Sequence, residues 1–200
     1  MAVTSVTAVQ DGSTNQEEIE LILAARKGDV DAFNSLVLAY QLRIYNLAAR
    51  ILGDTDAAED ITQNTFLTAF LNLPRFRNGS FRSWLYRIAT NACYDEFRRH
   101  KRNPTISIDD EDDADERLLP QYDFTVPSIL PEKEYERREL DQAIQLALNR
   151  LDADQRTVVV LADLQEFDYQ QVSQILGVPI GTVKSRLARA RVQLRYLLNI

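Results

Sequence analysis

Apolar residues recur every three to four positions through two long stretches of the chain, and no strand-like alternation of useful length interrupts them. In the first stretch this spacing predicts four helices, at residues 17–27, 31–52, 56–71 and 81–100. Gly28, Gly53 and Pro74 separate these helices, and Asp56 and Ser80 are the expected caps of the third and the fourth. The N-terminal half is therefore expected to be a helical domain.

The second stretch predicts four more helices. Residues 135–151 and 152–166 form the first pair, and a capping box at Asp152 and Gln155 opens the second helix. A short helix then ends at Gly177, where the chain can turn left-handed, and another follows, an order typical of a helix-turn-helix. The narrow apolar stripe of that last helix consists of Val183, Leu187, Ala190, Leu194 and Leu197. We predict an all-α fold of two helical domains.

A length of 200 residues allows one or two domains, and a hydrophobic fraction of 45% excludes a wholly disordered chain. No apolar run approaches the ~18 residues that a membrane-spanning helix needs, so membrane insertion is not expected. Met1–Gln10 lacks the basic start and apolar stretch of a secretory signal. We expect a cytoplasmic protein whose polar tail, residues 1–16, is disordered.

The residues that most enzymes need are scarce. One cysteine, Cys93, and one histidine, His100, cannot form an internal disulfide or a zinc cluster, and they are too few to indicate a nucleophile with its base. Cys93 is expected to be a small apolar side chain packed on a helix. There is no glycine-rich phosphate loop and no motif with paired carboxylates. We expect no enzyme activity, no cofactor and no metal.

The acidic charge lies mainly in one segment. The chain has 30 acidic and 23 basic residues, a net charge of −7. Residues 103–134 hold ten of the acidic and two of the basic residues, together with four prolines. Charge of this density repels itself and proline stops helices, so this segment is predicted to be a flexible linker. The expected organisation is the tail, a domain at 17–102, this acidic linker and a domain at 135–200.

Basic residues gather near the end of each expected domain. Residues 75–102 hold eight basic and two acidic side chains, and residues 169–200 hold five basic side chains and no acidic one. Two basic stretches of helical length within an acidic protein indicate two surfaces for nucleic acid.

The predicted helix at 81–100 carries two kinds of side chain on two faces. The face expected in the core holds Phe81, Leu85, Ile88 and Ala92. The second face holds Arg87, Asn91, Tyr94 and Arg98. Cations, an amide and an aromatic ring suit phosphate contact, base-edge hydrogen bonding and base stacking. The loop at 75–80 mixes the same chemistries and is suited to hold an unstacked base. The alternative is a solvated helix face beside a structural turn.

The last helix is the other candidate surface. Opposite its apolar stripe lie Thr182, Ser185, Ala188 and Arg189, and on its flanks lie Lys184, Arg186, Arg191 and Arg195. A recognition helix presents such residues to the major groove, while flanking cations neutralise phosphates. Pairing of Arg189 or Lys184 with guanine contributes about 1–3 kcal/mol of discrimination. The alternative is a basic helical hairpin that binds protein.

Three segments, taken in order, carry a resemblance to a known family. They are residues 56–66 (DAAEDITQNTF), residues 81–95 (FRSWLYRIATNACYD) and residues 180–191 (IGTVKSRLARAR). They are similar to region 2.2, to regions 2.3 and 2.4, and to the region 4.2 recognition helix of extracytoplasmic-function (ECF) sigma factors, group 4 of the sigma-70 family. The resemblance covers roughly residues 18–102 and 133–198. It implies a sigma factor that binds core RNA polymerase and directs promoter-specific transcription initiation.

The resemblance also implies partners and the residues that meet them. Region 2.2 is expected to bind the β′ clamp helices of core RNA polymerase, and region 4 the β flap. The residues carried over for the clamp helices are Glu59, Asp60, Gln63, Asn64 and Phe66. Those carried over for opening and reading the minus-ten promoter element are Phe76, Arg77, Asn78, Ser80, Trp84, Arg87, Asn91, Tyr94 and Arg98. Those carried over for the minus-thirty-five element are Thr182, Lys184, Ser185, Arg186, Arg189 and Arg191.

Several alternatives stay open. Trp84 fits a place in the core better than base stacking. The acidic linker either follows the polymerase channels used by template and nascent RNA, or is an inert tether. A partner anti-sigma protein is expected from the resemblance. The competing function is a self-sufficient helix-turn-helix repressor or activator, whose N-terminal domain senses a ligand or dimerises and which binds duplex DNA without polymerase.

Overall fold

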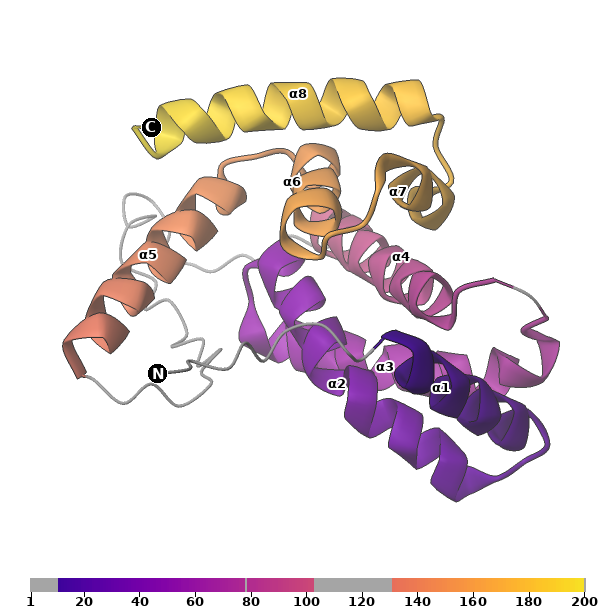
Figure 1. Ribbon diagram of the computed structural model, residues 1–200. Helices are drawn as coiled ribbons and strands as arrows, with labels where there is room; N and C mark the ends of the chain where they lie inside the picture. Colours follow the sequence, from indigo (N-terminus) through magenta and orange to yellow (C-terminus); the bar gives the residue numbers. More distant parts are fainter. Residues whose placement is uncertain (1–10, 78, 103–130, 200) are drawn as a thin grey trace, which may run out of the picture.

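The computed structural model describes residues 11–77, 79–102 and 131–199, and the regular structure in these ranges is entirely helical (Figure 1). The N-terminal domain consists of α1 (Asp11–Arg26), α2 (Val30–Leu52), α3 (Thr55–Asn72), the 3-10 turn η1 (Leu73–Arg75) and α4 (Phe81–Arg102). The C-terminal domain consists of α5 (Pro131–Asn149), α6 (Ala153–Val159), the π-helical turn η2 (Val160–Leu164), α7 (Tyr169–Leu176) and α8 (Ile180–Leu197). The prediction of an all-α fold with two helical domains is confirmed.

The helix boundaries of the N-terminal domain follow from its caps. Asp29 accepts a hydrogen bond from the backbone N–H of Ala32 at 3.0 Å and opens α2, and Gly53 closes that helix in a left-handed conformation. The cap of α3 is Asp54, not Asp56 as predicted. Both acids suit the first turn of a helix, where the helix dipole favours negative charge, so spacing alone did not separate them.

Two helices extend into segments that were expected to be irregular. α1 begins at Asp11, within the predicted tail, and α5 begins at Pro131, within the predicted linker. The second difference has a clear reason, because proline is well suited to the first position of a helix, where its missing N–H is not needed. The remainder of the predicted tail and linker, residues 1–10 and 103–130, lies outside the described residues.

The helix-turn-helix is formed as predicted, with one cap that the pattern did not show. Asp168 opens α7 in a full capping box with Gln171, and Gly177 closes it in a left-handed conformation. The apolar stripe of α8 faces inward, with Val183, Leu187 and Ala190 buried and Leu194 and Leu197 half-buried.

The expected helix at 152–166 is divided. Asp152 caps α6 through the N–H of Gln155 at 2.8 Å, but the Gln155 side-chain oxygen is buried without a hydrogen-bond partner, so only half of the predicted capping box forms. The π-helical turn η2 then interrupts the helix, and a left-handed residue, Glu166, precedes Phe167. This irregular turn directs Gln165 and Phe167 toward the N-terminal domain.

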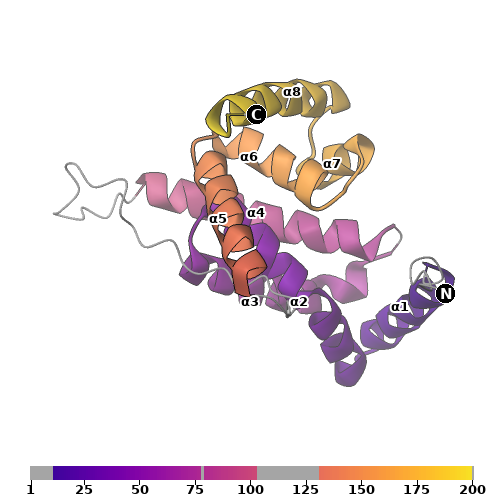
Figure 2. The ribbon, with the colours of Figure 1, turned by 60° about the vertical axis from the view of Figure 1, so that its left-hand side comes forward.

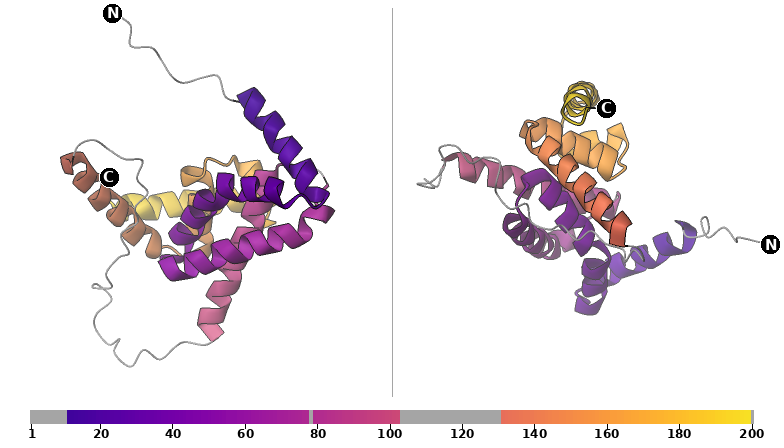
Figure 3. Two further views of the ribbon diagram at one scale, coloured as in Figure 1. Left: turned by 90° about the horizontal axis from the view of Figure 1, so that it is seen from below. Right: turned by 90° about the vertical axis from the view of Figure 1, so that its left-hand side faces the viewer.

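The two domains pack against each other with α4 between them. Figures 1 and 2 show α2 and α3 on one side of α4, α6 and α7 on another, and α8 on the far side of α6 and α7. In the right-hand view of Figure 3, which is seen along α8, the C-terminal domain covers one side of the N-terminal domain, and α5 lies against α2. One hydrophobic cluster runs through both domains. Among the described residues, no helix is both long and apolar enough to cross a membrane.

Candidate nucleic-acid interface

α4 presents the predicted second face largely as expected. The Ser80 hydroxyl accepts a hydrogen bond from the N–H of Ser83 at 3.2 Å, which confirms Ser80 as the cap. Arg87, Asn91 and Arg98 are exposed, and Tyr94 is half-buried. Of the four predicted core positions, Phe81 and Leu85 are buried, whereas Ile88 and Ala92 are half-buried. A cation–amide–cation row therefore lies along one side of the helix.

An aromatic group supports the loop before α4. The ring centroids of Phe76 and Trp84 lie 5.0 Å apart, and both rings contact Phe81. Trp84 is half-buried against the hydrophobic core, which agrees with its interpretation as a core residue. Arg77 and Ser80 are exposed, and Asn78 lies outside the described residues. The loop and α4 line a cleft of about 420 Å³ whose opposite wall includes Gln174 and Ile175 of α7.

α8 carries the second basic surface. Lys184, Ser185 and Arg189 are exposed near its N-terminal end, and Thr182 is half-buried. The Ser185 hydroxyl donates to the carbonyl oxygen of Thr182 at 3.0 Å, so that the hydroxyl oxygen remains available as an acceptor. These side chains stand opposite the buried stripe, as a recognition helix requires.

Two arginines of α8 have partners inside the protein. Arg191 pairs with Asp163 at 2.6 Å, and this hydrogen bond is the main reason why the pKa of Arg191 lies above its ordinary value. Arg186 pairs with Asp154 of α6. Both were predicted to contact DNA, and each must leave its carboxylate, or share it, to do so.

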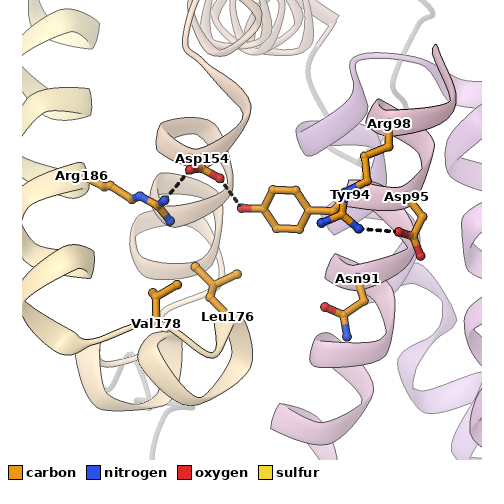
Figure 4. A pocket seen from close by; sticks show the side chains of 8 residues that line it. All are labelled: Asn91, Tyr94, Asp95, Arg98, Asp154, Leu176, Val178 and Arg186. Atoms are coloured by element: carbon orange, nitrogen blue, oxygen red, sulfur yellow. Dashed lines mark hydrogen bonds and ion pairs between the residues drawn. The ribbon is translucent and has the colours of Figure 1, made fainter. Parts of the chain in front are cut away.

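Asp154 also connects α8 with α4. The Tyr94 hydroxyl donates a hydrogen bond to Asp154 at 3.1 Å, and Figure 4 shows this carboxylate between Tyr94 and Arg186. Burial is the first cause that raises the pKa of Tyr94 to about 12, and the Asp154 carboxylate raises it further. Next to this contact lies a cleft of about 470 Å³, lined by Asn91 and Arg98 on the α4 side.

The contact between the domains uses residues that the sequence did not single out. Tyr86 is fully buried; its hydroxyl donates to the side-chain oxygen of Gln165 at 2.6 Å, and its ring lies 4.8 Å from that of Phe167. Arg82 donates a hydrogen bond to the carbonyl oxygen of Gln165, and its guanidinium carbon lies 4.2 Å from the centroid of the Phe167 ring. No local pattern could identify this set, because it depends on how segments about eighty residues apart meet.

A second group of polar contacts joins α2 with α5 and α6. Arg156 donates to the carbonyl oxygens of Ile51 and Asn149, each at 2.8 Å, although it is only 8% exposed. Burial lowers the pKa of Arg156 below its ordinary value, and the carbonyl oxygens from both domains satisfy much of its donor capacity. Arg50 pairs with Asp141 at 3.0 Å. These polar contacts, made by the buried Arg156 and the half-buried pair of Arg50 and Asp141, favour one relative placement of the domains.

The surface predicted for polymerase lies on α3 and needs one correction. Glu59, Asp60, Gln63 and Asn64 are exposed, in two adjacent rows on one face of the helix. Phe66 is only 8% exposed and belongs to the core of the domain. Its place in the segment similar to region 2.2 did not reveal that it faces inward, away from the four polar side chains.

The described residues contain no group of three histidine, cysteine or acidic side chains that could hold a metal. Cys93 is buried, as predicted, and burial raises the pKa of its thiol to about 12. A thiol in this state is not a nucleophile at neutral pH.

Two family models match the chain. Sigma-70 region 2 matches residues 36–103, and Sigma-70, region 4 matches residues 141–194. The chain is similar to the ECF RNA polymerase sigma factor SigW of Bacillus subtilis, with 39% identity over 87% of this chain and 92% of the relative. It is also similar to the RNA polymerase sigma-H factor of Pseudomonas aeruginosa, with 32% identity over 89% of this chain and 92% of the relative.

Solved structures resemble both domains together. The sigma factor RpoE of Bartonella quintana, in complex with the anti-sigma factor NepR, superposes with a TM-score of 0.65 at 28% identity, covering 86% of this chain and 99% of that one. CnrH, in complex with the cytosolic domain of CnrY, gives a TM-score of 0.66 at 24% identity, covering 92% and 97%. The latter likeness concerns the fold alone.

Proposed function

The chain belongs to the sigma-70 family of RNA polymerase sigma factors, in its ECF class, and on that premise we propose how its surfaces share the work of promoter recognition. As a sigma factor it binds core RNA polymerase and directs promoter-specific, DNA-templated transcription initiation. It is a DNA-binding initiation regulator, and we infer that it is not itself an enzyme. The observation that supports two separate promoter-binding surfaces is the pair of basic rows on α4 and α8, one in each domain.

α8 is proposed to read the minus-thirty-five element as duplex DNA. The exposed residues Lys184, Ser185 and Arg189 lie where a recognition helix meets base edges, with Thr182 beside them. An arginine that donates two hydrogen bonds to guanine is the most common specific contact in the major groove. Arg186 and Arg191 flank the row and are assigned to phosphates once they leave Asp154 and Asp163.

α4 and the loop before it are proposed to open and read the minus-ten element. Arg87 and Arg98 are placed for phosphate contact, and Asn91 for a hydrogen bond to a base edge. The cleft of about 420 Å³ beside Phe76 and Arg77 offers aromatic and basic groups to an unstacked base. Such a pocket offsets the few kcal/mol that flipping a base costs. Tyr94, Ser80 and Trp84 border this surface, Trp84 mainly as its support.

Core polymerase is proposed to meet the protein at two places. The exposed polar face of α3, formed by Glu59, Asp60, Gln63 and Asn64, suits the β′ clamp helices, and the C-terminal domain suits the β flap. An anti-sigma protein is a further proposed partner, supported by the likeness to RpoE, which was solved with the anti-sigma factor NepR. The protein would act in the cytoplasm, where polymerase meets its promoters.

The domain limits proposed are 17–102 for region 2 and 135–200 for region 4, with an acidic linker between them. α1 and α5 begin a few residues before these limits, at Asp11 and Pro131. The family models match ranges inside both domains.

Run-off transcription tests the proposal. Purified protein is added to core RNA polymerase and a promoter library, and transcripts are expected to depend on the protein. The same protein without polymerase is then tested by footprinting on duplex DNA. A self-sufficient regulator would protect DNA at nanomolar concentration without polymerase and give no protein-dependent transcripts, and that result would contradict the proposal.

A further inference from the structure

One carboxylate contacts both surfaces that we assign to promoter DNA. Asp154, in the first turn of α6, accepts a hydrogen bond from the Tyr94 hydroxyl of α4 and forms an ion pair with the Arg186 guanidinium of α8. Figure 4 shows Asp154 between these two side chains, which approach it from opposite sides. A single acidic residue of the C-terminal domain therefore holds one group from each promoter-binding surface. We call this arrangement the Asp154 contact.

The groups held by Asp154 are donors that proteins use for phosphate. Guanidinium and phenol hydroxyl groups both bind phosphate oxygens in protein–DNA complexes. A carboxylate offers an arginine the same kind of charge-assisted hydrogen bond as a phosphate. Only 25% of the Arg186 side chain is exposed, and Tyr94 is half-buried. A DNA phosphate must therefore compete with the Asp154 carboxylate for both side chains.

The space beside the Asp154 contact is small. The cleft of about 470 Å³ has Asn91 and Arg98 on the α4 side and Val178 of the helix-turn-helix on the other. A volume of this size is typical of a small-ligand pocket. The second cleft, of about 420 Å³, is likewise lined from both domains, by Arg87 of α4 and Gln174 of α7. The row of α4 that should read a promoter strand therefore lines two clefts that the C-terminal domain also lines.

The neighbouring contacts close the domains without using the proposed DNA-binding residues. Tyr86 and Arg82 of α4 both bind Gln165, and both pack against Phe167. Glu166 in this turn has a left-handed backbone, a conformation that is strained for a residue other than glycine. Strain of this kind persists where the surrounding contacts favour it. The closed arrangement is therefore built into the fold, and the Asp154 contact adds the promoter-binding groups to it.

We propose that Asp154 is an intramolecular substitute for a DNA phosphate, which holds Tyr94 and Arg186 and keeps the free protein in a closed arrangement that does not accept promoter DNA. The inference rests on the promoter roles proposed above for α4 and α8. DNA that binds only the open arrangement loses affinity in proportion to the fraction of molecules that are open. Polymerase or DNA would open the domains by separating them and replacing the carboxylate.

The test compares two variants that each remove one negative charge. Asp154→Asn preserves the size of the side chain and removes the ion pair with Arg186. Asp163→Asn is the matched control, because Asp163 also pairs with an arginine of α8, Arg191, but does so within the C-terminal domain. The control thus frees an α8 arginine and leaves the charged acceptor of the Tyr94 hydroxyl in place.

Domain separation is measured by energy transfer between dyes on the full-length free protein. Leu38→Cys on α2 and Tyr196→Cys on α8 provide the labels, because the native side chains are 71% and 83% exposed. The native Cys93 is 1% exposed and is protected from labelling. Asp154→Asn is expected to lower the ratio of closed to open molecules by up to about tenfold, because the Tyr94 hydroxyl then donates to a neutral amide oxygen and no longer to a carboxylate. Asp163→Asn is expected to leave the transfer unchanged.

DNA binding gives the second readout. A fluorescent single-stranded minus-ten oligonucleotide is titrated with each variant without polymerase, and its anisotropy is recorded. The affinity of Asp154→Asn is expected to rise severalfold over that of the natural chain, and by clearly more than that of Asp163→Asn, because only the first change opens the surface of α4.

Equal energy transfer in Asp154→Asn and Asp163→Asn, together with equal affinity for the oligonucleotide, would overturn the proposal. Tyr94→Phe is a second variant in case Asp154→Asn misfolds, since it preserves the ring and removes only the hydroxyl donor. It should also reduce energy transfer, by a smaller factor. No reduction would count against the proposal. The transfer measurement needs neither promoter nor polymerase. Run-off transcription can therefore still depend on the protein when this inference fails, and the domains can open in Asp154→Asn when the proposed function fails.

Discussion

α4 and α8 are both basic helices with a row of candidate DNA-binding residues, but their surroundings differ. α8 buries one stripe, around Val183 and Leu187, and leaves Lys184 and Arg189 exposed on the other side. α4 is covered on two sides, by α2 and α3 of its own domain and by α6 and α7 of the other (Figure 2). An amphipathic pattern identifies the core of a helix's own domain, but it does not identify a surface that a second domain covers.

The largest expected effect comes from the side of α4 that the second domain covers. Tyr86→Ala removes a fully buried ring and its hydrogen bond to Gln165, so we expect the free energy of unfolding to fall by about 3–5 kcal/mol. Ser185→Ala, on the open side of α8, should change it by less than about 0.5 kcal/mol. Denaturant unfolding followed by circular dichroism measures both. A small effect of Tyr86→Ala would mean that the two domains do not close on α4 in solution.

α8 could be predicted nearly completely from the sequence because it depends on one domain. The spacing of Val183 and Leu187, together with the left-handed Gly177, was sufficient to place its buried and exposed sides. Tyr86 and Asp154 were missed because their roles require the relative placement of segments that are sixty or more residues apart. Local patterns also predict the wrong residue or the wrong place where two choices suit the pattern equally.

Two such errors show what local patterns lack. Asp54 and Asp56 both suit the start of α3, and only the backbone geometry shows that Asp54 is the cap. Phe66 lies in a segment whose polar residues are exposed, yet it faces the core. In both cases the residue type was compatible with two places, and packing decided between them.

The next effect concerns the open side of α8. Arg189→Ala should reduce discrimination at one position of the minus-thirty-five element by about 1–3 kcal/mol, because a bidentate base contact is lost. Arg195→Ala should weaken binding to all sequences about equally, as expected for a phosphate contact. Binding of polymerase with each variant to a panel of upstream sequences measures the difference. If the two variants lower all affinities alike, Arg189 does not read a base.

Substitution of two glycines compares the stability cost of an added methyl group at the contact between the domains with its cost inside one domain. Gly53 and Gly177 both have left-handed backbones, with φ of +71° and +65°, which cost alanine about 1–2 kcal/mol. A Cβ at Gly53 would also lie 2.6 Å from the side-chain oxygen of Asn149 across the domain contact. A Cβ at Gly177 would have no such neighbour within 4 Å among the described residues. Gly53→Ala should therefore destabilise the protein more than Gly177→Ala.

The Asn149→Ala background isolates that extra cost. With the Asn149 side chain removed, Gly53→Ala and Gly177→Ala should lower the free energy of unfolding by the same amount within about 0.5 kcal/mol. An extra cost that persists in this background would show that it does not come from the contact between the domains.

The smallest effect concerns the ionisation of Tyr94, which takes place only at high pH. Burial raises the pKa of its phenol from 10.0 to about 12. Because the pKa of Tyr94 is higher in the folded protein, the protonated phenol stabilises the folded state. This stabilisation is fully present below pH 10 and is lost as the pH rises through the folded pKa near 12. The phenolate absorbance of the natural chain minus that of Tyr94→Phe should show one group ionising near pH 12. Ionisation at the ordinary value would place Tyr94 outside the Asp154 contact.

The central claim is that α4 and α8 read two different promoter elements, and a cycle of protein and DNA substitutions tests it most directly. Open-complex formation by polymerase is measured with the natural chain, Asn91→Ala and Arg189→Ala on promoters altered in the minus-ten or the minus-thirty-five element alone. We predict that Asn91→Ala loses sensitivity only to minus-ten changes and Arg189→Ala only to minus-thirty-five changes. Equal coupling of either residue to both elements would contradict the account.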